Sequence, residues 1–227
     1  MILGIYGSGG LGREIYEIAI RRNVASSLWN QIVFIDDFSD EGDYFGTKRI
    51  QFNSLKINKN EYECVIAVGE PLSREKLFQK LTEEDIKLTC LTDPTAIVSP
   101  TAKIKSGTLI CEFSTIHSGV ELGYNTLIQP FCDIGHDIKV GNHTVLSPFC
   151  APGGRTVFGD RVFVGLQSSI MDLLTIGDDA IVGMGAAVFR DVPAGATVVG
   201  NPARITRGND EHKIFTTHEK KDDKIET

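Results

Sequence analysis

The sequence lacks the features of a membrane-spanning chain and of a secreted one. No stretch approaches the roughly 18 uncharged apolar residues that a membrane-spanning helix needs. The first residues, MILGIYGSGG, contain no basic segment and reach glycine too early for a secretory signal peptide. The five cysteines are scattered, odd in number and without a C-x-x-C pair, which disfavours disulfide frameworks and zinc knuckles. We therefore expect a cytoplasmic protein that needs no metal.

Positive charge is also scarce. The chain has 23 Lys and Arg against 30 Asp and Glu, which leaves a net charge of −7 at pH 7. A protein that grips nucleic acid needs a basic face to displace phosphate counterions, so we expect no nucleic-acid partner. At 227 residues, the chain is long enough for one large domain or two small ones.

Residues 1–92 alternate between strand-like and helix-like segments. Apolar runs at 2–6, 32–35 and 64–68 predict buried strands, and a further strand is expected at 86–91. A helix should follow the first run, after a glycine-rich loop with the sequence GSGGLG. Such alternation predicts a small parallel sheet covered by helices, about half of a dinucleotide-binding fold.

A six-residue repeat replaces this pattern from Val98 onward. Every sixth residue from 98 to 188 is large and apolar, with Pro152 as the only exception, and glycine often follows. The period suits a prism with three flat faces, in which each coil takes three hexads. Cys132 and Cys150 occupy small inward positions one coil apart, which identifies them as core residues. Because hexads bury their core against neighbouring hexads, the repeat should fold without residues 1–90.

The repeat, together with Gly135-His136-Asp137 and the closing VGNPAR segment at 199–204, resembles the left-handed β-helix acyltransferases. With the GSGGLG front end, the chain resembles one branch of them, the sialic acid O-acetyltransferases and their nucleotide-aminosugar N-acetyltransferase relatives. The resemblance implies an α/β Rossmann-like acceptor-binding domain at 1–92 and an all-β left-handed parallel β-helix at 93–205. A polar tail is expected at 206–227.

His136 is the candidate general base. Acetyl transfer from a thioester needs a group that takes a proton from the attacking amine or hydroxyl, and histidine serves most often. His136 directly follows a corner glycine, so its side chain should point outward at an edge of the prism. The family carries a His-Asp or His-Glu pair here, which implies that Asp137 supports the base. A surface histidine in a turn is the alternative.

The remaining histidines and one glutamine have less defined roles. His117 lies one coil earlier and either lines the same edge or occupies a corner usually held by glycine. His143 is expected in an exposed turn without function, and His212 and His218 belong to the polar tail. Relatives often place asparagine seven positions before the histidine, where this chain has Gln129, a change that bears on acceptor choice or rate.

The GSGGLG loop has two competing interpretations. Glycines between a strand and a helix let a phosphate approach the backbone and the helix N-terminus. Alone, with Asp36 as a ribose-binding acid, the loop indicates a nicotinamide-dependent dehydrogenase, but the second mononucleotide half is missing. A tight turn without a ligand is a further alternative. The resemblance instead implies that the acceptor is bound by Gly9, Gly10, Leu11, Asp36, Asp37 and Gly69.

The resemblance places acetyl-CoA against Val145, Leu166, Gly183 and Met184. Leu166 and Met184 are one coil apart and should form an apolar column suited to a pantetheine arm. His136 falls on a different edge, one hexad around the coil. A three-fold trimer would bring one chain's His136 edge against its neighbour's column, so we expect a homotrimer with shared sites.

These observations favour an acetyl-CoA-dependent acetyltransferase that acts on a sugar. N-acetylation of a nucleotide-linked aminosugar, such as a UDP- or GDP-4-amino-deoxy sugar, is the preferred reaction. O-acetylation of sialic acid and a non-catalytic sugar-binding β-helix scaffold are the alternatives.

Overall fold

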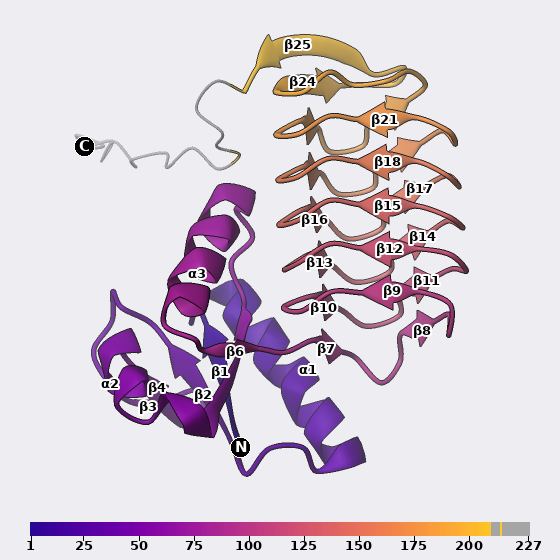
Figure 1. Cartoon of the computed structure of the whole chain (residues 1–227). Coiled ribbons are helices and arrows are strands. Elements are labelled where there is room, and N and C mark those ends of the chain that lie inside the picture. Colours follow the sequence, from indigo (N-terminus) through magenta and orange to yellow (C-terminus); the bar gives the residue numbers. More distant parts are fainter. Residues whose placement is uncertain (210–213, 215–227) are drawn as a thin grey trace, which may run out of the picture.

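The computed structural model describes residues 1–209 and residue 214 (Figure 1). An α/β part lies beside a tall stack of coils, and the last coils extend beyond it (Figure 1). His212 and His218, with most of the expected tail, lie outside the described residues. Among the helices of the described chain, none is long and apolar enough to cross a bilayer.

The α/β part is built on a six-stranded sheet with the order β3-β4-β2-β1-β5-β6. The strands are β1 (Ile2–Tyr6), β2 (Gln31–Ile35), β3 (Gly42–Tyr44), β4 (Thr47–Ile50), β5 (Tyr62–Ile66) and β6 (Lys87–Leu88). The helices are α1 (Gly10–Ser26), α2 (Phe52–Ile57) and α3 (Pro71–Glu83), with a 3₁₀ turn at Lys59–Glu61. Strands β2 and β5 flank β1 in parallel, as the alternating pattern predicts.

The coils place two-residue strands on three faces, and the longer β24 and β25 end the first face. The first face holds β7 (Leu91–Thr92), β10 (Leu109–Ile110), β13 (Leu127–Ile128), β16 (Val145–Leu146), β19 (Phe163–Val164), β22 (Ile181–Val182), β24 (Ala196–Val199) and β25 (Arg204–Gly208). The second holds β8 (Ile97–Val98), β11 (Thr115–Ile116), β14 (Asp133–Ile134), β17 (Ala151–Pro152), β20 (Ser169–Ile170) and β23 (Ala187–Val188). The third holds β9 (Lys103–Ile104), β12 (Glu121–Leu122), β15 (Lys139–Val140), β18 (Val157–Phe158) and β21 (Thr175–Ile176).

Successive coils repeat every 18 residues. Leu109 pairs with Leu127, for example, and Leu127 with Val145, in a parallel ladder. The second residue of each strand points inward, and these residues form one continuous buried core that includes Cys132 and Cys150. The hexad pattern is therefore confirmed as the core of a parallel β-helix. The expected strand at 86–91 is instead divided, since β6 ends the α/β sheet and β7 begins the coils.

Three corners join the faces, and each turns through a left-handed residue. We name them the Asn125 corner (third to first face), the Phe131 corner (first to second) and the His136 corner (second to third). The turning residues are Asn125 at φ 53°, Phe131 at φ 61° and Asp137 at φ 58°. Glycines beside the corners allow the coils to approach each other, because a Cβ at Gly135 would lie 2.9 Å from the carbonyl oxygen of Pro152.

The α/β part covers the first face of the coils. Outward residues of that face, such as Leu109, Leu127 and Val145, are buried together with Ile15 and Ile18 of α1. Figure 1 shows α1 and α3 against this side of the stack. The apolar contact makes the two parts one packed unit.

Arg74 of α3 fixes the α/β part to the Asn125 corner. Its guanidinium is fully buried and donates hydrogen bonds to the carbonyl oxygens of Ile66, Val68 and Asn125 and to the side-chain oxygen of Asn125, at 2.6–3.0 Å. Burial lowers the pKa of Arg74 to about 9, which still leaves it charged at neutral pH. The carbonyl groups of Ile66, Val68 and Asn125 point at the guanidinium of Arg74, and their dipoles stabilise its buried charge.

Candidate active site

His136 and Asp137 form a hydrogen-bonded pair at an exposed corner. His136 Nδ1 lies 2.9 Å from Asp137 Oδ2, and their side chains are 55% and 60% exposed. The left-handed backbone of Asp137 turns its carboxylate back toward the ring. Among the described residues, Nε2 has no hydrogen-bond partner. A neutral ring that donates Nδ1–H to the carboxylate presents its basic Nε2 outward, as a general base requires.

Two glycines make room for this pair. A Cβ on Gly154, one coil after His136, would lie 2.6 Å from Nε2 and 2.7 Å from Cε1. A Cβ on Gly119, one coil before Asp137, would overlap its Oδ1. Sequence reasoning missed both glycines, although counting 18 residues backward and forward from the pair identifies them.

A second histidine–carboxylate pair joins the preceding coil, which carries His117, to the coil of His136, which carries Asp133. His117 follows β11 on the second face, and its Nε2 lies 2.8 Å from Asp133 Oδ1. Both side chains are exposed. His117 takes the place that Gly135 holds one coil later, and its side chain lies near the edge that carries His136.

His143 is buried, contrary to the expectation of an exposed turn. The ring is 7% exposed at the Asn125 corner, 5.2 Å from the ring of Phe78 on α3. Its Nδ1 lies 3.1 Å from Asn125 Nδ2. The expectation was wrong because α3 packs over this corner. Burial lowers the pKa of His143, which favours the neutral ring.

The glycine-rich loop opens α1 at the carboxyl end of β1. Gly7 adopts φ 114°, and a Cβ on Gly12 would overlap the carbonyl oxygen of Gly7, so both positions require glycine. Gly9 caps α1 without a side-chain hydrogen bond, and a Cβ at Gly9 or Gly10 would meet nothing within 4 Å. The loop thus combines a tight turn with open space over the helix N-terminus.

The predicted acids lie next to this loop but differ in their bonding. Asp36 accepts hydrogen bonds from the Ser8 hydroxyl and, at 2.9 Å, from the Phe38 amide. Asp37 accepts hydrogen bonds from Tyr6 and Lys80 at 2.6 and 2.7 Å. Burial opposes ionisation of Asp37, but these bonds hold its pKa below the usual value.

Gly69 follows β5 and is half-buried, and Leu11 packs against the apolar core beside α1. Because β1, β2 and β5 are parallel, their carboxyl ends meet at one edge of the sheet. The structure therefore brings the predicted acceptor residues to a common edge.

Three of the four predicted acetyl-CoA residues lie together at the Phe131 corner. Leu166 and Met184 are stacked one coil apart and are 44% and 73% exposed. Gly183 precedes Met184, and a Cβ there would lie 2.7 Å from Val199 Cγ1. Val145 is 1% exposed beneath the α/β part, so the structure does not bring its side chain to this edge.

Within the described part of the chain, no group of three or more His, Cys, Asp or Glu side chains is arranged to hold a metal ion. The chemistry available at the His136 corner is that of an imidazole and a carboxylate.

Comparisons with known proteins agree with this architecture. Residues 3–81 match the family model of the PglD N-terminal domain. The acetyltransferase domain of PglB from Neisseria gonorrhoeae FA1090, in complex with acetyl coenzyme A, is 26% identical with a TM-score of 0.85, covering 90% of this chain and 98% of that one. WeeI from Acinetobacter baumannii AYE is 29% identical with a TM-score of 0.85, covering 91% and 100%.

Matches to curated sequences are shorter. YvoF from Bacillus subtilis (strain 168) is 46% identical over 52 residues, which are 23% of this chain and 30% of YvoF. The chain thus spans less than a third of that relative. The PglD-type domain and two likenesses that span nearly the whole chain confirm the resemblance found in the sequence, to the hexapeptide-repeat acetyltransferases of left-handed β-helix fold.

Proposed function

We propose that this protein transfers the acetyl group of acetyl-CoA to the amino group of a nucleotide-linked aminosugar. The observation that carries the proposal is the exposed His136–Asp137 pair, whose Nε2 is left available for a substrate. The likeness to a domain that binds acetyl coenzyme A supports the choice of donor. Both proposed substrates are cytoplasmic compounds, so we place the activity in the cytoplasm.

In the proposed reaction, the acceptor nitrogen attacks the thioester carbonyl carbon while His136 Nε2 takes a proton from that nitrogen. Asp137 holds the ring through Nδ1 and stabilises the imidazolium that forms. The tetrahedral intermediate then collapses, the C–S bond breaks, and the CoA thiolate leaves with the proton from His136. Backbone amides near the corner glycines stabilise the transient oxyanion.

The acceptor is assigned to the edge of the α/β sheet, in a domain that comprises residues 1–92. The open N-terminus of α1 at Gly9 and Gly10 suits a phosphate group, because the helix dipole and free amides favour negative charge. Asp36 and Gly69 lie beside it, whereas Asp37 is held by Tyr6 and Lys80 and acts by shaping this edge.

The donor is assigned to the Phe131 corner of the coil domain, residues 93–205. Leu166 and Met184 offer an exposed apolar edge to the pantetheine arm, and Gly183 keeps the backbone accessible beside it. This corner and the His136 corner lie at opposite ends of the second face, so six residues, or roughly 20 Å of extended chain, separate them. One chain alone therefore does not bring base and thioester together.

A homotrimer with sites shared between chains resolves this separation. The Phe131 corner carries a stacked and exposed ladder of Phe113, Phe131 and Phe149, with ring centroids 5.1 and 4.9 Å apart. Exposed apolar surface of this kind favours association. A cyclic trimer sets the His136 corner of one chain against the Phe131 corner of the next.

Complementation tests the shared site. His136→Ala and Met184→Arg chains should each be inactive, and mixed trimers formed by dissociation and reassociation should regain part of the activity. Mixed trimers that are verified by native mass spectrometry and remain inactive would place the whole site within one chain.

The function itself is tested by measuring the thiol released from acetyl-CoA with a panel of nucleotide 4-amino sugars and with sialic acid. We expect turnover with an aminosugar, and His136→Ala should lower it by about 10²–10⁴-fold. Asp137→Asn should be milder, and Lys139→Ala, a charge removed from the third face, should leave turnover unchanged. Turnover only with sialic acid would favour O-acetylation, and absence of thiol release would favour a sugar-binding scaffold.

A further inference from the structure

Arg155 lies next to the ring of His136, on the following coil. Its backbone amide donates to the carbonyl oxygen of His136 at 2.8 Å. The His136 ring packs over Gly154, the residue before Arg155, since a Cβ there would lie 2.6 Å from Nε2. Arg155 turns the His136 corner one coil after Asp137 with the same left-handed backbone, at φ 61°. Its side chain therefore starts beside the outward nitrogen of the proposed base.

The guanidinium of Arg155 is exposed and has no partner. Among the described residues, it makes no hydrogen bond and no ion pair. Two acids lie near it: Asp137, which bonds the His136 ring at 2.9 Å, and Asp172, one coil after Gly154. Neither of them pairs with Arg155 in the part of the chain that the structure describes. The corner thus carries an unpaired guanidinium beside the base.

A cation at this place opposes the chemistry proposed for His136 unless an anion joins it. When His136 takes a proton from the acceptor, the ring becomes an imidazolium, and a nearby positive charge disfavours that form. A phosphate bound to Arg155 removes this cost, because a guanidinium matches phosphate oxygens in both geometry and charge.

A nucleotide-linked aminosugar supplies such an anion. The phosphate on its anomeric carbon is separated from the amino group by no more than the width of one sugar ring. An acceptor whose nitrogen lies within about 3 Å of His136 Nε2 therefore brings this phosphate within reach of the long Arg155 side chain.

We propose that Arg155 determines acceptor specificity by binding the sugar-linked phosphate of the nucleotide-linked aminosugar. The inference rests on the proposed function, since it takes His136 as the base and a nucleotide-linked sugar as the acceptor. Base and guanidinium belong to the same chain, so the inference does not depend on how subunits assemble. The carboxylate of sialic acid is the other anion of this kind, and the choice of acceptors in the test separates the two.

The test compares wild-type protein and Arg155→Gln with three acceptors. These are the nucleotide 4-amino sugar that the wild-type protein turns over, the same aminosugar as a neutral methyl glycoside, and sialic acid. A charge-assisted hydrogen bond to phosphate corresponds to about tenfold to a hundredfold in affinity, so the variant should raise the KM for the nucleotide sugar by that factor with little change in kcat. The apparent affinity for the glycoside, measured as a KM or as an inhibition constant, should not fall. Arg155→Lys keeps the charge without the forked geometry and should give an intermediate KM.

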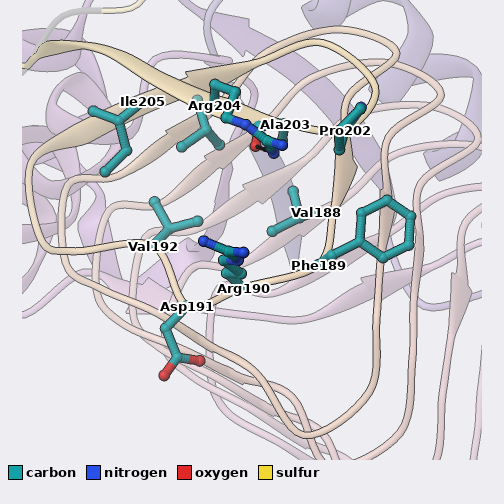
Figure 2. A pocket seen from close by; sticks show the side chains of 10 residues that line it. Val188, Phe189, Arg190, Asp191, Val192, Pro202, Ala203, Arg204 and Ile205 are labelled. Carbon is teal, nitrogen blue, oxygen red and sulfur yellow. Dashed lines mark hydrogen bonds between the residues drawn. The ribbon is translucent and has the colours of Figure 1, made fainter.

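Arg190→Gln is the matched control. Arg190 is an exposed arginine in the same column as His136, three coils later, where it lines a cavity at the C-terminal end of the coils (Figure 2). At about 4.8 Å per coil, it lies about 14 Å from His136 along the axis. Its loss should therefore leave the KM for the acceptor unchanged at saturating acetyl-CoA. Thermal unfolding checks that each variant is folded.

A folded Arg155→Gln protein with the wild-type KM for the nucleotide sugar would overturn the inference. An equal loss of affinity for the neutral glycoside would overturn it as well, as would a fall in kcat at unchanged KM, which would assign the guanidinium to the oxyanion instead. An effect on sialic acid alone would assign Arg155 to a carboxylate and refute the choice of phosphate. The proposed function fails separately, if the wild-type protein releases no thiol with any nucleotide aminosugar.

Discussion

Gly154→Ala should impair acetyl transfer without destabilising the fold. The added methyl group would lie 2.6 Å from His136 Nε2, 2.7 Å from Cε1 and 3.0 Å from Cδ2. Carbon atoms in contact are normally about 3.5–4.0 Å apart, so the ring must move by about 1 Å. A displacement of that size can lower the rate by about 10²-fold when it affects a catalytic group.

Stability should change little in this variant. Gly154 does not adopt the left-handed conformation, so alanine is compatible with its backbone. Replacing glycine by alanine at a compatible site restricts the unfolded chain and contributes about 0.4–1 kcal/mol to stability. The ring that must move is more than half exposed and is free to turn toward solvent. We therefore expect a Tm within about 4 °C of the wild-type value.

The assay combines thiol-release kinetics with thermal unfolding. Ser118→Ala is the matched control, because Ser118 occupies the same column one coil before His136 and its loss introduces no clash. In the double variant His136→Ala/Gly154→Ala, the glycine substitution should cause no further loss. Wild-type turnover in a stably folded Gly154→Ala protein would refute the assignment of catalysis to the ring position seen here.

Three further outcomes follow from the contact between the two parts of the chain. Arg74→Met leaves several buried carbonyl oxygens without donors and should lower the free energy of unfolding in urea by about 3 kcal/mol. Burial opposes ionisation of Asp93, but hydrogen bonds from Thr95 and Arg21 hold its pKa below the usual value, so its contribution is present above about pH 4 and is lost as pH falls further. Thermal unfolding at decreasing pH should show this loss, and Asp93→Asn should remove it. Deletion of residues 1–90 exposes the apolar first face and should produce aggregation visible by light scattering, whereas a monodisperse rod would contradict this reasoning.

The sequence predicts the core of the coils well, because the large apolar residues at every sixth position are the ones whose side chains point inward. Outward positions are harder to assign, since their environment depends on what packs against each face. Leu127 and Lys139 are both outward strand residues, yet the first is buried beneath the α/β part and the second is exposed. The outward residues of the first face are apolar at 18-residue intervals, a pattern that indicates a covered face and argues against a rod that is stable without residues 1–90.

The same limit applies to the candidate site. The motif locates His136 and Asp137, because the corner glycine before them determines their direction. The hexad period does not reveal that Gly119 and Gly154 clear space for the pair, since that relation crosses from coil to coil. His143 was misjudged for a related reason, because only the docking of α3 determines that its corner is buried.

The 18-residue register determines which residue lies at which edge of the coils. His136 and Arg190 share an edge only because whole coils separate them. Loss of one residue between them would turn every later edge by one position and direct core side chains toward solvent. Loss or duplication of a whole coil would preserve every edge and change only the distance from the base to the end of the stack. A chain of this design can therefore change its length by whole coils while keeping its core and the side chains at its corners.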